Sequence, residues 1–121
     1  MRRARAKFTC PCCGYRTFRR RPGNYEICHV CFWEDDPVQL LDPWYPGGAN
    51  NVSLQEAQQN YAQIGVSEPK FKPNVKGVLS GDARDPLWRP VKDADRQRAT
   101  TPAKLTKENP KGPWKWYYWE Q

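Results

Sequence analysis

One segment of the chain has the apolar spacing of an amphipathic helix. Ser53 and Glu56 form the pattern of a capping box, and Gly65 provides a C-terminal stop. Between them, apolar residues recur at intervals of three or four and fall on one helical face: Leu54, Ala57, Tyr61 and Ile64. The pattern predicts a helix over residues 53–65 that packs this face against the rest of the domain.

Two shorter segments upstream have the pattern of β-strands. Residues 15–18 alternate rings with polar side chains, and residues 25–27 form a second short segment. Residues 20–24 between them, Arg-Arg-Pro-Gly-Asn, have the composition of a turn. The pattern predicts a β-hairpin, and a pair of cysteines lies just beyond each of its ends.

The other segments are irregular. Residues 32–52 are rich in proline, glycine and aromatic side chains, and we expect an ordered loop there. Residues 91–112 are polar and basic, which is typical of a linker or a disordered segment. Five aromatic residues then occupy six positions, 114–119. The chain thus divides into three parts: a basic arm at residues 1–7, a domain at 8–90 and a basic, aromatic-ended tail at 91–121.

Composition limits the size of the core. Only 38% of the 121 residues are hydrophobic and 12 are prolines, and such small cores tend to need an additional staple. The formal net charge is +7, but residues 34–69 hold six acidic side chains and no Lys or Arg. This basic, acidic, basic order matters more for the choice of a partner than the total charge does.

Four of the five cysteines have the spacing of a metal site. They form two C-x2-C pairs separated by 14 residues: Cys10 and Cys13, then Cys28 and Cys31. Two such turns can present four thiolates to one tetrahedral Zn(II), and a site closed by four sulfurs is structural because no position remains for water. We therefore predict one structural zinc ion. The predicted fold is a small α+β fold: a zinc-ribbon-like β-hairpin with two cysteine knuckles, an aromatic loop, one capped helix and an irregular basic tail.

Two further residues lie inside the knuckles. Cys12 is interpreted as a packing residue, as an exchangeable ligand, or as a reactive thiol whose pKa is lowered by Arg16 and by residues 19–21. His29 is the single histidine and would have to displace a cysteine of the second pair to bind the metal. The sequence supplies no general base for Cys12 and leaves no open position on the metal, so we expect no enzymatic activity.

The acidic segment and the glycine-rich loop have two interpretations each. Residues 34–36, together with Asp42, are either a hard-cation or acid–base site or local structure, and consecutive side chains rarely converge on one ion. Residues 47–50, Gly-Gly-Ala-Asn, lack the Lys and hydroxyl of a nucleotide loop. In both cases the structural interpretation is favoured.

Several motifs resemble those of the bacterial cysteine-rich CPCC family. They are Cys10-Pro11-Cys12-Cys13-Gly14-Tyr15, Tyr25-Glu26-Ile27-Cys28, Cys31-Phe32-Trp33-Glu34-Asp35-Asp36, Gly47-Gly48-Ala49-Asn50, Val52-Ser53-Leu54 and Glu56-Ala57. The resemblance covers roughly residues 8–65 and continues more loosely to about Pro90. His29 departs from the family pattern, which usually has proline there. The resemblance implies a small metal-binding module and no particular reaction.

Recognition is the function we expect, and two hypotheses remain open. The first is a non-enzymatic adaptor that binds another protein, and the alternative is a nucleic-acid-binding protein that uses the basic arm and the hairpin arginines. The residues expected to make these contacts are Arg16, Arg19, Arg20, Arg21, Trp114, Trp116, Tyr118 and Trp119. The aromatic end has three interpretations: it packs back onto the domain, contacts a partner or is disordered.

The chain has no signal for secretion or for a membrane. No apolar segment follows the basic N-terminus, and no run of about 18 apolar residues occurs. We therefore expect a cytoplasmic protein without a small-molecule substrate, in which paired cysteines are metal ligands rather than disulfides.

Overall fold

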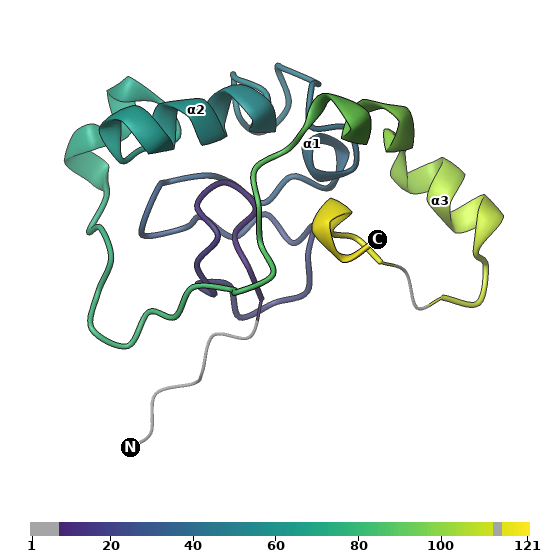
Figure 1. Cartoon of the computed structure of the whole chain (residues 1–121), viewed down its shortest axis with the longest axis horizontal. Coiled ribbons are helices and arrows are strands. Elements are labelled where there is room, and N and C mark those ends of the chain that lie inside the picture. The colour runs from purple at the N-terminus through teal and green to yellow at the C-terminus, as the bar shows by residue number, and fades with distance from the viewer. Residues whose placement is uncertain (1–7, 113–114) are drawn as a thin grey trace.

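The computed structural model describes residues 8–112 and 115–121, and these residues form short helices joined by ordered loops (Figure 1). The helical elements are α1 (Pro37–Leu41), α2 (Leu54–Ile64), η1 (Pro69–Asn74), η2 (Asp93–Arg98), α3 (Pro102–Glu108) and η3 (Tyr118–Glu120). None of the described helices is long and apolar enough to cross a membrane.

The predicted β-hairpin is wrong. Over the described residues the backbone forms only isolated bridges: Phe8 with Phe18, Tyr15 with Arg84, and Ile27 with Glu34. The physical reason is that each predicted strand finds its partner elsewhere. Residues 15–18 pair with Phe8 and with the loop at residues 83–84, whereas residues 25–27 pair with residues 34–35 just beyond the second cysteine pair. The zinc-ribbon-like α+β description therefore fails.

The predicted capped helix is present as α2. The Ser53 side chain accepts a hydrogen bond from the Glu56 N–H at 3.1 Å, and Gly65 ends the helix with φ of 76°. The left-handed conformation at this position is one that glycine adopts without steric cost. Leu54 and Ala57 are fully buried, as the pattern predicted, so α2 packs one face on the domain.

The predicted ordered loop at residues 32–52 contains α1 at its centre. Asp36 caps α1 by accepting hydrogen bonds from the Val38 and Gln39 N–H groups, and Pro37 follows at the first helical position. The Gln39 side chain is fully buried and bonds the backbone of Tyr45, Asn50 and Val52. The glycine-rich segment is thus folded around Asp36 and Gln39, which is a structural role.

The region predicted to be an irregular tail contains ordered helices. In η2, the buried Asp95 carboxylate accepts two hydrogen bonds from the Arg89 guanidinium at 2.8 and 2.9 Å. α3 begins at the Thr101 cap and packs against α1 without any buried residue of its own. The prediction of a wholly irregular tail is therefore wrong, because local caps and one ion pair fix the backbone.

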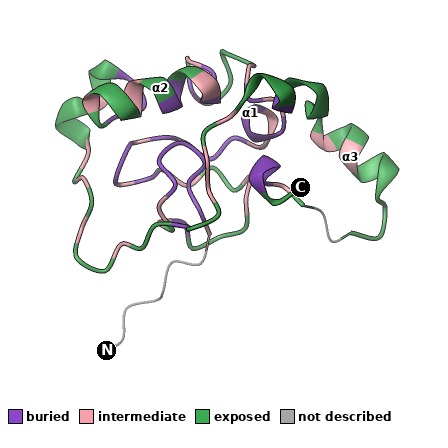
Figure 2. Ribbon diagram, viewed as in Figure 1, coloured by how far each residue is buried: buried purple, intermediate pink, exposed green. Residues whose placement is uncertain are grey.

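Cysteines form the centre of the core rather than its edge. All five are fully buried, and they share one cluster with Phe18, Trp33, Leu40 and Leu54. The last turn of the chain joins the same cluster through Tyr117, Tyr118 and Trp119. Figure 2 shows this arrangement, with buried residues concentrated in the N-terminal loops and the C-terminal turn while α3 is largely exposed.

Candidate metal centre

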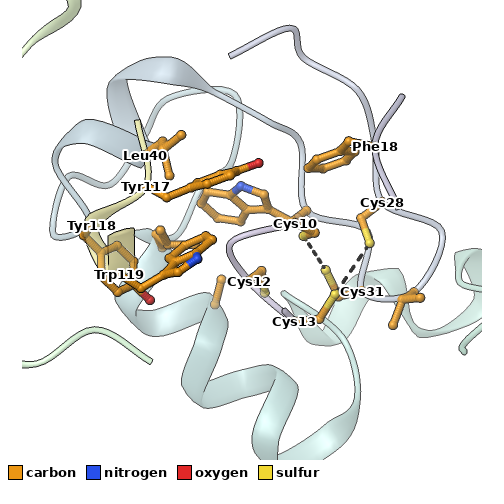
Figure 3. Packing of buried hydrophobic residues seen from close by; sticks show 14 residues of the cluster. Cys10, Cys12, Cys13, Phe18, Cys28, Cys31, Leu40, Tyr117, Tyr118 and Trp119 are labelled. Atoms are coloured by element: carbon orange, nitrogen blue, oxygen red, sulfur yellow. Dashed lines mark hydrogen bonds between the residues drawn. The ribbon is translucent and has the colours of Figure 1, made fainter. Parts of the chain in front are cut away.

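Four cysteine sulfurs converge at one point in the core (Figure 3). The Sγ atoms of Cys10, Cys13, Cys28 and Cys31 all lie within 4.8 Å of one another. The Sγ atoms of Cys10 and Cys31 are 3.6 Å apart, and those of Cys13 and Cys28 are 3.8 Å apart. These are the cysteines that the C-x2-C spacing singled out, and together they could hold a metal ion. None of the five cysteines forms a disulfide.

The two cysteine pairs lie on turns with the same hydrogen-bond pattern. In the first knuckle the Gly14 N–H donates to the Cys10 carbonyl at 2.9 Å, and in the second the Phe32 N–H donates to the Cys28 carbonyl at 2.8 Å. A second hydrogen bond closes each knuckle: the Cys10 N–H donates to the Tyr15 carbonyl, and the Cys28 N–H donates to the Trp33 carbonyl. Repetition of this local pattern explains why both pairs aim their sulfurs inward.

The residue after each knuckle has a left-handed backbone. Gly14 has φ of 83°, and a Cβ there would lie 2.7 Å from the Trp88 ring. Phe32 occupies the equivalent place with φ of 69°, a conformation that costs energy for a bulky side chain. Its ring packs against Phe71 with centroids 4.6 Å apart. The second knuckle therefore combines backbone strain with an aromatic contact where the first has a glycine.

Thr17 supplies a hydrogen bond to the cluster that sequence reasoning missed. Its hydroxyl lies 3.1 Å from the Cys28 sulfur. Burial by itself raises the pKa of Cys28, but hydrogen bonds from the other three cluster thiols and from Thr17 outweigh it, and the pKa is lowered. Burial raises the pKa of Cys10 and of Cys31. Nothing in the sequence around Thr17 marked it as a partner of a cysteine eleven positions away.

Cys12 and His29 lie outside the four-sulfur cluster. Cys12 is fully buried, and burial raises the pKa of its thiol. Of the three interpretations of Cys12, the reactive thiol with a lowered pKa is therefore wrong, because Arg16 and residues 19–21 are exposed while the thiol is in the core. The His29 Nε2 atom lies 2.8 Å from the Asp82 carboxylate. His29 thus helps to fix the loop that follows η1 rather than contributing a ligand.

The three consecutive acidic residues do not converge. Asp36 caps α1, while the Asp35 carboxylate accepts a hydrogen bond from the Gly23 N–H at 2.8 Å. Asp35 is 1% exposed, and one of its oxygens has no hydrogen-bond partner. Burial raises the pKa of Asp35 to about 6. The acidic segment is local structure in this fold and does not form a cation site.

The arginines expected to make contacts are exposed. Residues 19–27 form what we call the arginine loop, whose backbone is fixed by Glu26: its carboxylate accepts hydrogen bonds from the Arg19 and Arg20 N–H groups. Tyr25 and Ile27 of the same loop are 52% and 50% exposed. The loop therefore presents cationic and apolar side chains together on a fixed backbone. Arg16, before this loop, is also exposed and lies 3.7 Å from the Asp85 carboxylate.

The aromatic end of the chain packs back onto the domain. Tyr118 and Trp119 are buried and Trp116 is half-buried, whereas Trp114 lies outside the described residues. The rings of Tyr118 and Trp119 are therefore not available on the surface of this structure. Of the expected contact residues that the structure describes, only the arginines form an exposed group.

Comparison with protein families matches residues 8–81 to the family described as Cysteine-rich CPCC. The match includes both knuckles, α1, α2 and η1, and it ends before the loop that carries Asp85 and Trp88. Among curated proteins, none matches the chain.

Proposed function

We propose that this chain, which belongs to the cysteine-rich CPCC family, is a structural zinc module that recognises another macromolecule and has no catalytic activity of its own. One Zn(II) per chain is held by Cys10, Cys13, Cys28 and Cys31. The observation that carries the proposal is the convergence of four fully buried sulfurs. A sphere closed by four thiolates leaves no position for water or substrate, so the ion stabilises the fold.

The sulfur geometry suits a tetrahedral ion. With Zn–S bonds of about 2.3 Å, the edges of a regular tetrahedron are about 3.8 Å long. The Cys10–Cys31 and Cys13–Cys28 sulfur–sulfur distances, 3.6 and 3.8 Å, agree with this edge. Thiolate donors in this geometry favour zinc over hard cations. Five free cysteines also support a reducing compartment, and we propose the cytoplasm.

Metal analysis of the purified chain tests the zinc site. We expect one zinc per chain, and we expect Cys13→Ser and Cys28→Ser each to lose the ion together with the folded state. Cys12→Ser is the matched control, because Cys12 neighbours Cys13 but lies outside the cluster, and this variant should keep the ion. A wild-type chain that is folded and free of metal would contradict the proposal.

The arginine loop is the surface we propose for recognition of a protein partner. It combines the exposed arginine side chains of residues 19–21 with the exposed apolar side chains of Tyr25 and Ile27. Cationic and apolar groups on one fixed loop suit an acidic protein surface with an apolar anchor. Affinity capture with the wild-type chain and with the Arg19→Gln, Arg20→Gln, Arg21→Gln variant, followed by identification of both protein and nucleic acid, tests this proposal.

Binding of nucleic acid is the second candidate, favoured by the exposure of Arg16 and of residues 19–21. The exposed Tyr25 ring on the same loop would then be available to stack on a base. A gel shift should then weaken steeply as salt rises. The gel shift is repeated with the Arg19→Gln, Arg20→Gln, Arg21→Gln variant. Its control replaces the exposed Lys104, Lys107 and Lys111 by Gln, which removes the same charge from the α3 region. Absence of any shift at low salt would eliminate this candidate.

A further inference from the structure

The C-terminal segment, residues 115–121, packs on a surface built largely by the family domain. Tyr117, Tyr118 and Trp119 are 8%, 5% and 9% exposed. The Tyr117 and Trp119 rings are stacked with centroids 4.2 Å apart, and Tyr118 meets Trp119 edge-on at 5.0 Å. The three rings thus form one compact unit, and Figure 3 shows Tyr118 and Trp119 on the side of Cys12 that faces away from Cys28 and Cys31.

Hydrogen bonds hold this unit on what we call the docking surface: the backbone carbonyls of Thr9 and Arg89, and the Gln58 side chain, which also bonds the Pro11 carbonyl. The Tyr117 hydroxyl donates to the Thr9 carbonyl at 2.8 Å, and the Tyr118 hydroxyl donates to the Arg89 carbonyl. Gln58 of α2 donates to the Tyr118 oxygen and to the Pro11 carbonyl, each at 2.9 Å. Both tyrosine hydroxyls are therefore hydrogen-bonded by polar groups at fixed positions, as the side chains of a bound peptide would be.

Residues 96–112, which we call the C-terminal arm, lead towards this segment and contribute no buried residue. Residues 96–112 are all exposed or half-buried, although they include the second half of η2 and all of α3. An element with few buried contacts opens at a small fraction of the global free energy of unfolding. Residues 117–119 are thus buried against the domain, whereas residues 96–112, which precede them in the tail, are not.

The family match separates the surface from its occupant. Thr9, Pro11 and Gln58 lie within the matched residues 8–81, whereas residues 115–121 lie beyond them. The docking surface is thus built mostly by residues inside the family match, and the segment that fills it lies outside the match.

We propose that the docking surface is a binding site for an aromatic peptide, and that residues 115–121 of the same chain occupy it as a separable ligand. The arm keeps the peptide at high effective concentration, so the surface is filled in the intact chain. Opening of the arm frees the site and uncovers the first knuckle. This inference does not depend on which metal the cysteines hold or on which partner the arginine loop binds.

The test begins from the intact, folded chain. A protease recognition sequence is inserted between Lys111 and Gly112, both of which are exposed, and the chain is cut after its folding and metal content have been established. The fragment should remain bound at high concentration, leave on dilution, and be replaced by a labelled synthetic peptide of residues 115–121. Helical circular dichroism and metal content should remain unchanged during the exchange.

Peptide variants then test recognition without altering the domain. Tyr118→Phe removes the hydroxyl that joins Gln58 to Arg89 and should weaken binding about tenfold. Glu120→Gln is the control, because Glu120 is exposed, and its affinity should equal that of the original peptide. Equal affinities for all three peptides would show that the rings adhere without specific docking and would overturn the proposal.

Three other outcomes would overturn the proposal as well. If the domain unfolds as the fragment leaves, the segment is an integral part of the core. If the cut domain remains folded but binds no labelled peptide, the surface is not a binding site. If the uncut chain is a dimer that exchanges its C-terminal segments, the occupant is the segment of a second copy rather than the chain's own.

Discussion

Thr17 offers the most direct test of how residues around the cysteine cluster affect its affinity for a metal. Its hydroxyl lies 3.1 Å from the Cys28 sulfur and stabilises the thiolate that a metal requires. Thr17→Val keeps the shape and removes the hydroxyl, so we expect the metal affinity to fall about tenfold, at the lower end of such effects. Competition with a chromogenic chelator measures this change. Thr17→Ser keeps a hydroxyl and should retain the wild-type affinity, and equal losses in both variants would refute the role of the hydrogen bond.

Asp35 makes the stability of the fold fall as pH rises, whereas a carboxylate held in an ion pair makes it rise. Burial raises its pKa to about 6 in the folded chain, so the folded state binds the proton more tightly than the unfolded state. Stability is therefore lost as pH rises through about 6. Asp35→Asn cannot ionise and can still accept from the Gly23 N–H. Relative to this variant, the wild-type chain should lose about 1 kcal/mol of stability between about pH 5 and about pH 7.

Chemical denaturation of both proteins at a series of pH values gives that difference directly. Any titration that the two proteins share, including that of the cysteines, cancels in the comparison. A constant difference across the range would show that Asp35 has an ordinary pKa in the folded chain.

At the scale of elements, the first knuckle depends on a close contact with a distant loop. A Cβ at Gly14 would lie 2.7 Å from the Trp88 ring, and the Trp88 indole N–H is held by the Pro11 carbonyl at 2.9 Å. Gly14→Ala therefore suffers both a left-handed backbone and a steric clash. Gly47→Ala is the matched control, because its φ of 79° is similar but a Cβ there meets nothing within 4 Å.

The two alanine variants should differ in thermal denaturation. Backbone strain should cost each about 1–2 kcal/mol, and the clash with Trp88 should cost Gly14→Ala a further 1–3 kcal/mol or so. Similar melting temperatures would mean that the Trp88 loop moves aside freely and does not brace the knuckle.

Elements whose determinants are local could be predicted from the sequence, and elements fixed from a distance could not. The capping box around Ser53 and the C-x2-C spacing are complete within a few residues, so α2 and the four converging cysteines could be anticipated. The hairpin could not, because residues 15–18 pair with Phe8 and the loop at 83–84 instead. Alternation shows that a segment can be extended, but it does not identify the neighbour that satisfies its backbone.

At the scale of the whole molecule, the first knuckle is where the separate parts of the chain meet. Thr9 accepts a hydrogen bond from Tyr117, Pro11 accepts from Gln58 and Trp88, and Gly14 accepts from the Asp85 N–H. No periodicity in the sequence predicts such contacts, since each joins residues more than forty positions apart. The described part of the chain contains no sheet, and its fold is held together by the four-cysteine cluster and by the segments that pack around it.

Removal of the metal should therefore unfold the domain as a unit. Without the ion, four thiols must share a buried space that suits thiolates around a cation, and binding free energy that had stabilised the fold is lost. α2 has 11 residues and is too short to persist alone in water. Hydrogen exchange after chelation should show loss of protection in α2 and η3 together, and zinc should restore both whereas magnesium should not. Protection that survives in α2 after complete removal of the metal would contradict this expectation. It would show that the aromatic and aliphatic part of the core keeps the domain folded without a metal ion in the cysteine cluster.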